Sequence, residues 1–207
     1  VLIMPEHMSE ERRGVMKAFG AEIILTPREC SMEAAIDLSR DMEAQVQCKV
    51  LDNFSNPDNH IANYEGNVTE IWRDTEGEIT HFVSSMGTTG TIMGTSRFLK
   101  EKNQHIEIVG VQPTEGSQIP GIRRWQEEYL PKIYHPEDVD RIIDVSQQEA
   151  ENTVRELAAK EGIFAGISSG GAVAAALNLS AQVENATIVV IICDRGDRYL
   201  STGVFPA

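Results

Sequence analysis

The residues best suited to chemistry lie in a short run of glycine and threonine, Gly87-Thr88-Thr89-Gly90-Thr91. The run follows an apolar stretch at 81–85 and precedes a helical pattern that extends to about Lys102. Backbone N–H groups freed by glycine, threonine hydroxyls and a helix N-terminus together make a site for an anion such as phosphate. The run has neither the lysine of a P-loop nor the G-x-G-x-x-G spacing of a dinucleotide site. An ordinary strand-to-helix turn that uses glycine for its geometry is the alternative.

A second run of small residues, Gly166-Ile167-Ser168-Ser169-Gly170-Gly171, precedes an alanine-rich helix at 172–179. By itself it indicates an N-cap at Ser168 or Ser169 and glycines that let the helix pack close to a sheet. Both runs fall at the ends of strands or extended segments, where open α/β sheets bind their ligands. The two runs together therefore favour a ligand site more strongly than either does alone.

A long stretch at 113–131 carries two arginines beside an indole, Arg123-Arg124-Trp125. A loop of this length inside a compact domain is usually a functional lid or a disordered segment. By themselves the arginines indicate a solvated basic pair beside an anchoring tryptophan.

Cys193 and Asp194 lie at the end of the longest apolar stretch, which runs from 186 to 193. A cysteine at a strand end more often serves packing than chemistry. A reactive thiolate at Cys193 would need a nearby positive charge, which Arg195 could supply. No group of histidines, cysteines and acids has the spacing of a metal site, so we expect no metal and assign no role to the histidines at 7, 60, 81, 105 and 135.

The elements that must position these residues are short apolar runs that alternate with longer helical patterns, which predicts an α/β, doubly wound, mostly parallel sheet. The run 188–192 is apolar at every position, as a parallel sheet covered on both faces requires. Ser9 is a good N-cap for a helix at 9–19, with Gly20 after its end. The predicted strands are 1–4, 22–25, 50–51, 81–84, 106–111, 141–145 and 187–192.

The turn cluster Asn56-Pro57-Asp58-Asn59 predicts a domain boundary. We expect residues 1–56 to be the remnant of a smaller N-terminal α/β domain and residues 57–207 to form a C-terminal α/β domain that binds phosphate. The chain opens directly on Val1-Leu2-Ile3-Met4-Pro5, a run typical of a strand. We therefore expect it to be a fragment of a longer protein.

Composition excludes several classes of protein. The chain has 207 residues with 18 basic and 32 acidic side chains, a net charge of −14, which repels nucleic acid and anionic membranes at long range. No apolar stretch approaches the roughly 20 residues that cross a bilayer. Three cysteines without a C-x-x-C pair indicate neither a disulfide framework nor a zinc site, so a reducing cytoplasm fits best.

Five separated segments resemble the fold type II pyridoxal-phosphate enzymes, which share a tryptophan synthase β-like fold. The runs 84–91 and 162–171 are similar to the cysteine synthases (O-acetylserine sulfhydrylases), and the segments 115–125, 193–198 and 199–205 are similar to the B isoform of that family. The resemblance covers essentially all of the chain. Because five segments match in the right order, chance similarity is improbable.

The resemblance implies pyridoxal 5′-phosphate as the cofactor, with Ser168 bonded to its pyridine nitrogen and its phosphate bound by Gly87, Thr88, Thr89, Gly90 and Thr91. A serine rather than a carboxylate leaves that nitrogen largely neutral, which suits β-elimination better than transamination. The implied reaction is a β-replacement that forms L-cysteine from O-acetyl-L-serine and sulfide, or S-sulfocysteine from thiosulfate. The resemblance also implies small-molecule substrates, a homodimer, and no nucleic-acid or membrane partner.

The same resemblance places Arg123, Arg124 and Trp125 in a mobile loop over the cofactor, where they could hold an anionic sulfur donor together with Cys193 and Asp194. Asn53 stands where the family usually has Gln at a position that touches substrate. A side chain shorter by one methylene could loosen the grip on the substrate carboxylate or admit another amino acid.

None of the six lysines matches the family's Schiff-base lysine, which lies in a Ser-x-Lys-Asp-Arg-like segment. We expect that segment, and the substrate loop Thr-Ser-Gly-Asn-Thr-Gly, to precede Val1, so the chain alone should be inactive. The six lysines are at positions 17, 49, 100, 102, 132 and 160.

Two other interpretations stay open. The full-length protein could be another fold type II enzyme, such as a cystathionine β-synthase or a serine/threonine dehydratase. It could also be a non-catalytic phosphate-binding or regulatory module.

Overall fold

A computed structural model describes residues 1–205, apart from the side chain of Ser31. These residues divide into two compact units, one formed by Val1–Asp52 with the described residues from Asp197 onward, the other by Asn53–Gly196. The boundary that the sequence predicts between residues 56 and 57 concerns the domains of the whole protein and stays a prediction.

The smaller unit begins with a parallel β-α-β motif made of β1 (Leu2–Pro5), α1 (Glu10–Ala18) and β2 (Ile23–Thr26). Leu2 of β1 lies opposite Ile23 of β2. As predicted, Ser9 caps α1, because its hydroxyl oxygen accepts a hydrogen bond of 3.4 Å from the Arg12 backbone N–H.

The rest of the smaller unit consists of a 3₁₀ turn, η1 (Arg28–Cys30), the helix α2 (Ser31–Ala44), and most of a C-terminal 3₁₀ segment, η5 (Gly196–Thr202). Ser201 donates hydrogen bonds of 2.7 Å from both its backbone N–H and its hydroxyl to the Glu11 carboxylate in α1. These bonds lower the pKa of Glu11, since they favour its charged form.

The larger unit is built on a four-stranded parallel sheet in the order β5-β4-β3-β6. Its strands are β3 (His81–Ser85), β4 (Glu107–Pro113), β5 (Arg141–Val145) and β6 (Ile188–Val190). Its α-helices are α3 (Asp58–Glu65), α4 (Asn67–Asp74), α5 (Gly90–Lys102), α6 (Gln147–Glu156) and α7 (Ile167–Ser180). Shorter turns are η2 (Glu127–Tyr129), η3 (Pro136–Asp138) and the π-helical η4 (Leu157–Glu161).

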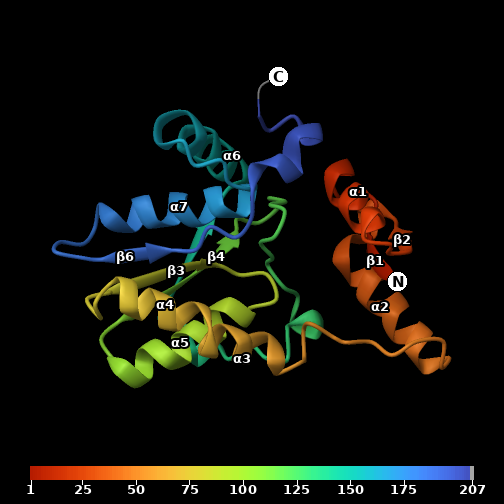
Figure 1. Cartoon of the computed structure of the whole chain (residues 1–207), viewed down its shortest axis with the longest axis horizontal. Coiled ribbons are helices and arrows are strands. Elements are labelled where there is room, and N and C mark those ends of the chain that lie inside the picture. Colours follow the sequence, from red (N-terminus) through yellow and green to blue (C-terminus); the bar gives the residue numbers. More distant parts are fainter. Residues whose placement is uncertain (206–207) are drawn as a thin grey trace. The chain divides into compact units, whose positions relative to one another are not determined.

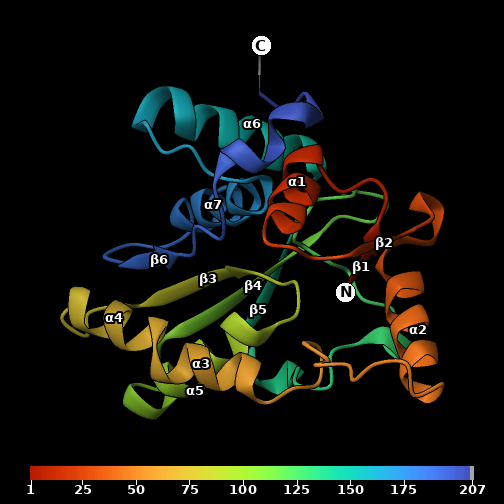
Figure 2. The ribbon, with the colours of Figure 1, turned by 45° about the vertical axis from the view of Figure 1, so that its right-hand side comes forward.

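Helices cover both faces of this sheet (Figure 1). Helix α7 packs on one face with α6 behind it, and α5 packs on the other face with α3 and α4. The rotated view in Figure 2 shows the same layers. Phe82 and Val83 of β3 and Ile108, Val109 and Val111 of β4 are fully buried, because both faces of the central strands are covered. The predicted α/β class with a parallel sheet is confirmed.

Two predicted strands differ from the structure. Residues 50–51 form no strand, because the chain after α2 folds back and Val50 donates its backbone N–H to the Glu43 carboxylate at 2.8 Å. The strand predicted at 187–192 is only Ile188–Val190, and its residues are half-buried, whereas a strand covered on both faces would be buried. Within the described residues β6 pairs with β3 alone, so one of its edges is open.

The strand order places a reversal of chain direction beside β3. From β3 the chain moves outward to β4 and β5, and it then returns across the sheet through α6 and α7 to form β6 on the other side of β3. Parallel α/β sheets bind ligands outside the carboxyl ends of their strands at such a reversal. The loops after β3 and β6, at 86–89 and 191–196, lie at this place.

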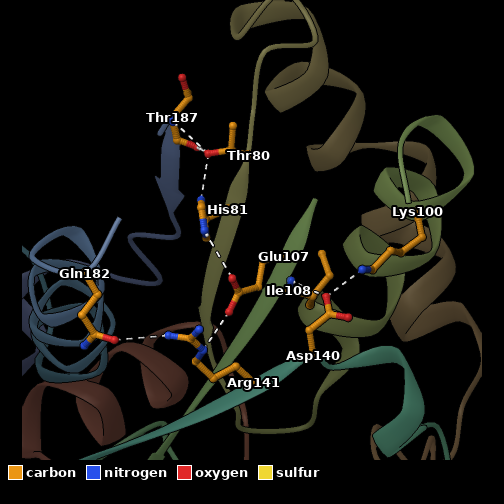
Figure 3. A network of polar contacts seen from close by, with 9 residues as sticks. All are labelled: Thr80, His81, Lys100, Glu107, Ile108, Asp140, Arg141, Gln182 and Thr187. Carbon is orange, nitrogen blue, oxygen red and sulfur yellow. Dashed lines mark hydrogen bonds and ion pairs between the residues drawn. The ribbon is translucent and has the colours of Figure 1, made fainter. Parts of the chain in front are cut away.

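The opposite end of the sheet is closed by a chain of polar contacts (Figure 3). His81 Nε2 lies 3.3 Å from Glu107 Oε2, and the other carboxylate oxygen of Glu107 lies 2.7 Å from Arg141 Nε. Thr80 continues the chain to β6 by accepting the Thr187 backbone N–H at 2.9 Å. These contacts tie together the amino ends of β6, β3, β4 and β5.

Among the helices of residues 1–205, none combines the length and the apolar character that crossing a membrane requires.

The packing of α5 against α3 predicts the effect of one substitution. A Cβ added to Gly94 would lie 2.2 Å from the His60 carbonyl oxygen, so Gly94→Ala should lower the free energy of unfolding of the full-length protein by about 1–3 kcal/mol in urea denaturation. Gly14→Ala in α1 is the matched control, since a Cβ there meets no atom within 4 Å and should stabilise by about 0.5–1 kcal/mol. Equal unfolding curves for Gly94→Ala and the wild type would contradict this packing.

Candidate cofactor-binding site

The predicted anion-binding run connects β3 to α5. Thr89 is the N-cap of α5 and has a left-handed backbone with φ of 70°. This conformation costs free energy for a β-branched residue, and such outliers cluster at functional sites. The Thr89 side chain is 4% exposed, and its hydroxyl has no hydrogen-bond partner among the described residues. A buried hydroxyl that is free to bond, placed at a helix N-terminus, can serve an anion bound there.

Two close approaches explain why this run contains glycine. A Cβ at Gly90 would lie 2.0 Å from Asn59 Oδ1, and a Cβ at Gly87 would lie 2.8 Å from the Gly121 carbonyl oxygen. Asn59 donates from Nδ2 to Thr88 Oγ1 at 3.0 Å and to the Asn53 carbonyl oxygen at 2.7 Å. Asn59 therefore holds the run in place from α3, a role that its position in a predicted turn cluster did not indicate.

The second predicted run lies at the same end of the sheet. Ser168 is buried in the first turn of α7, and its carbonyl oxygen accepts a 2.7 Å hydrogen bond from the Ser85 hydroxyl at the end of β3. Gly121, with φ of 91°, fits between the two runs, since a Cβ there would lie 3.1 Å from Ser168 Oγ. The structure thus brings together the two runs that the sequence singled out. It also adds Gly121 as a spacer, and only its neighbourhood of glycine and proline could have indicated that role.

The charge distribution at helix N-termini distinguishes α5 and α7 from the other described α-helices. Neither has an acidic residue in its first turn, whereas α1, α2, α3, α4 and α6 each have at least one. An acidic side chain there neutralises the positive end of the helix dipole. The two helices that begin at the site therefore keep this positive potential for an external anion.

Trp125 lies against the glycine run, but Arg124 does not reach it. Trp125 Nε1 donates to the Gly87 carbonyl oxygen at 2.7 Å, and its ring meets Phe54 edge to face at 5.4 Å. Arg123 donates its backbone N–H to the Met86 carbonyl oxygen at 2.8 Å. Arg124 instead pairs with Asp144 at 2.7 Å, at the carboxyl end of β5.

Cys193 and Asp194 follow β6 and lie beside the start of α7. Cys193 donates its backbone N–H to Ser169 Oγ at 2.9 Å, and the Asp194 carbonyl oxygen accepts the Gly166 N–H at 2.9 Å. Cys193 as a whole is exposed, yet neighbouring atoms crowd its sulfur, and this desolvation raises the pKa of the thiol. The negative charge of Asp194 adds to the rise, and hydrogen bonds with Ser168 and Ser169 oppose it. The positive charge of Arg195 therefore does not give Cys193 the lowered pKa that a thiolate role requires.

The remaining predicted residue, Asn53, is exposed, and its backbone is held by Asn59. Lys100 is half-buried and pairs with Asp140 at 2.7 Å, and the other five lysines are exposed. Within residues 1–205, no group of three or more histidine, cysteine or acidic residues could hold a metal ion.

Fold and site together define an α/β protein in which two helix N-termini lie at a chain reversal, an arrangement that can hold an anionic group. Residues 1–194 match the family described as pyridoxal-phosphate dependent enzyme. The chain is 60% identical over 205 residues to cysteine synthase B of Pseudomonas aeruginosa, covering 99% of this chain and 69% of that protein. It is 59% identical to cysteine synthase B of Salmonella typhimurium, covering 99% of this chain and 67% of the relative.

A solved cysteine synthase from Entamoeba histolytica superposes with a TM-score of 0.86 at 39% identity, covering 98% of this chain and 63% of that one. The chain thus spans about two thirds of the length of these relatives. It belongs to the family of pyridoxal-phosphate-dependent enzymes. The predicted family, fold class, class of enzyme and cofactor are confirmed.

The residues at the two runs fit this cofactor. Its phosphate is an anion, and the first turn of α5 offers backbone N–H groups, small residues that allow close approach, and the unpartnered hydroxyl of Thr89. The start of α7 offers the buried Ser168 hydroxyl on the far side of Gly121.

Removing the Thr89 hydroxyl tests the fit. In the full-length protein, Thr89→Val should weaken pyridoxal-phosphate binding by about 1.5–3 kcal/mol, or about 10- to 150-fold, in a titration followed by absorbance. The cofactor-free variant should be at least as stable as the wild type, because an unsatisfied buried hydroxyl is removed.

The control is Thr95→Val, since the Thr95 hydroxyl is also buried without a partner but lies further along α5. It should stabilise the protein and leave cofactor affinity unchanged. Equal cofactor affinity for Thr89→Val and Thr95→Val would remove Thr89 from the site.

The raised pKa of Cys193 predicts its reactivity. Because the folded protein disfavours the thiolate, iodoacetamide should alkylate Cys193 slowly at pH 7. The rate of alkylation should increase with pH, and the pH at its midpoint should be higher in folded than in urea-unfolded protein. Peptide mass mapping of full-length protein between pH 7 and 11 measures both midpoints. A folded midpoint below the unfolded one would show an activated thiolate.

Proposed function

We propose that the full-length protein is a cysteine synthase that forms L-cysteine from O-acetyl-L-serine and sulfide, or S-sulfocysteine when thiosulfate is the sulfur donor. The observation that carries this proposal is the convergence of the Gly87–Thr91 run and Ser168 at the carboxyl end of the sheet, around Gly121. The identity of 59–60% to two proteins named cysteine synthase B supports it.

In this proposal the first run holds the cofactor phosphate. Gly87, Thr88, Thr89, Gly90 and Thr91 surround it, and Thr89 supplies the hydroxyl that has no partner among the described residues. The left-handed backbone at Thr89 starts α5 directly at the phosphate, so the helix dipole adds to the hydrogen bonds. Asn59 keeps the Thr88 hydroxyl oriented.

Ser168 faces the pyridine nitrogen at the other end of the cofactor. When bound, pyridoxal phosphate withdraws electrons from the amino-acid substrate. A hydroxyl at Ser168 accepts or donates one hydrogen bond without bringing a negative charge, so it does not force a proton onto that nitrogen. This choice favours loss of a β-substituent over transfer of the amino group. Burial of Ser168 keeps water from competing for its hydroxyl.

The sulfur donor is proposed to enter beside Trp125 and the loop that contains Arg123 and Arg124. Trp125 is fixed next to Gly87, so a donor held by this loop lies close to the cofactor. Cys193 and Asp194 line the neighbouring end of β6, where a neutral thiol is a weak donor or acceptor and not a nucleophile. Asn53 is proposed to contact the amino-acid substrate, next to the ring of Phe54.

We also propose that the Schiff-base lysine lies outside the 207 residues. Lys100 is engaged by Asp140, and the other five lysines are exposed and lie outside the two glycine-containing runs. A homodimer in the cytoplasm, acting on small molecules and not on nucleic acid or membranes, completes the proposal. The net charge of −14 supports the absence of a nucleic-acid partner.

An assay of the full-length protein tests the function. Purified enzyme is given O-acetylserine with sulfide, O-acetylserine with thiosulfate, serine with homocysteine, or threonine alone, and the products are identified by mass spectrometry. We expect the highest kcat/KM with O-acetylserine. A preference for serine with homocysteine indicates a cystathionine β-synthase, and threonine deamination indicates a dehydratase.

Borohydride reduction of the same sample, followed by peptide mapping, should fix the cofactor on a lysine outside the present chain. A label on Lys100 or Lys132 would contradict the placement of the cofactor. A full-length protein that binds pyridoxal phosphate but fixes none of it, and turns over no substrate, would be a non-catalytic module.

A further inference from the structure

Arg124 is held away from the two runs, 87–91 and 166–171, by a hydrogen bond to Asp144. Neither the sequence analysis nor the comparison with the family gives Asp144 a role. Arg124 Nη2 donates to Asp144 Oδ2 at 2.7 Å, and Arg124 Nε donates to the Pro113 carbonyl oxygen at 3.0 Å. Both acceptors lie at the carboxyl ends of strands, Pro113 in β4 and Asp144 in β5. Two well-formed hydrogen bonds thus fix the guanidinium group on the rim of the sheet.

Asp144 is itself fixed by the sheet register. Gln112 of β4 is its direct partner across the parallel pair, and Gln112 Nε2 donates to Asp144 Oδ1 at 2.9 Å. One carboxylate oxygen is therefore used by Gln112 and the other by Arg124. This arrangement orients the carboxylate specifically for Arg124.

The segment that carries Arg124 touches both cofactor runs. Gly121 lies against Ser168 and Gly87, and the indole of Trp125 bonds the Gly87 carbonyl oxygen. Ile119 and Ile122 are buried and anchor the first half of the segment, whereas Arg124 is exposed. Trp125 at the site and Arg124 on the rim are therefore adjacent residues of one segment.

The Arg124–Asp144 pair is suited to release. The two side chains are 42% and 49% exposed, and ion pairs in solvent contribute only about 0–1 kcal/mol and weaken with salt. A dianionic ligand near the site can compete for the same guanidinium group, since two oxygens of such an anion match its donors.

We propose that Asp144 is a positioning residue that holds Arg124 on the rim of the sheet, and that release of this arginine sets the affinity of the site for a dianionic sulfur donor. The claim about the sulfur donor rests on the proposed function. The claim that Asp144 holds Arg124 concerns the chain alone and is measured without turnover.

The first experiment measures release directly in the full-length protein. Trypsin cleaves after Arg123 and Arg124, and cleavage requires the segment to leave the rim. Asp144→Asn should speed cleavage at these two bonds about two- to fivefold, which is the equivalent of up to about 1 kcal/mol. Asp144→Glu, which keeps a carboxylate, should restore slow cleavage.

Asp74→Asn is the matched control, because it makes the same substitution in another exposed ion pair, that of Arg73 with Asp74 at 2.8 Å. It should leave cleavage after Arg123 and Arg124 unchanged. Raising NaCl from 0.02 to 0.5 M should speed cleavage of the wild type and not of Asp144→Asn. Equal cleavage rates in Asp144→Asn and the wild type overturn the proposal.

The second experiment measures the KM of the full-length enzyme for each sulfur donor. Asp144→Asn should lower the KM for thiosulfate about two- to fivefold, change kcat less than twofold, and leave the KM for sulfide unchanged. In an Arg124→Ala background the same substitution should have no effect, because the group that Asp144 holds is gone. A purely structural Asp144 would instead raise the KM for both donors, or act equally in the Arg124→Ala background.

The two experiments separate the two proposals. If the wild type forms no cysteine from either donor, the proposed function fails while the cleavage result still decides the role of Asp144. If the wild type is active and the cleavage rates do not differ, only the role of Asp144 fails.

Discussion

The close approach of three backbone segments at the carboxyl end of the sheet is the constraint on which the site depends. Gly87, Gly121 and the start of α7 lie so near one another that a Cβ on Gly87 would lie 2.8 Å from the Gly121 carbonyl oxygen, and one on Gly121 would lie 3.1 Å from Ser168. The positive φ of Gly121, 91°, adds strain for any other side chain at this tight contact. This approach brings the glycine run and the start of α7 together at one end of the sheet.

Short-range donors must supply the affinity for an anion, because the chain as a whole repels one. With a net charge of −14, the long-range potential of the protein opposes a phosphate. Binding then depends on hydrogen bonds and helix dipoles that act within a few ångströms, a range shorter than the Debye length of about 8 Å at physiological salt. The absence of acidic residues from the first turns of α5 and α7 removes local competition for these donors.

Features with a local physical cause could be predicted from the sequence, and features made by tertiary packing could not. The cap at Ser9, the parallel sheet with buried β3 and β4, and the run at Gly87–Thr91 follow from side-chain chemistry and hydrophobic pattern. The role of Asn59 depends on how α3 packs against α5, and no pattern around it encodes this. Likewise, the sequence around Asp144 indicates only a polar residue in a strand. The register of β4 and β5, which places Gln112 beside it, could not be predicted from the sequence. The lost strand at 50–51 shows the same limit, since the Val50 backbone N–H bonds the Glu43 carboxylate instead of a neighbouring strand.

The two ends of the sheet use the same chemistry for opposite purposes. At the amino ends, His81 and Glu107 are only 13% and 25% exposed, and their contacts continue through Arg141 and Thr80 across all four strands (Figure 3). Arg141 is 42% exposed, so the network is shielded at His81 and Glu107 only, but contacts linked into a network resist disruption more than isolated surface pairs do. At the carboxyl ends, the Arg124–Asp144 pair is exposed and joins a loop to the sheet. The register that positions the glycine run and Ser168 therefore has side-chain support at the amino ends of the strands, away from the Arg124–Asp144 pair.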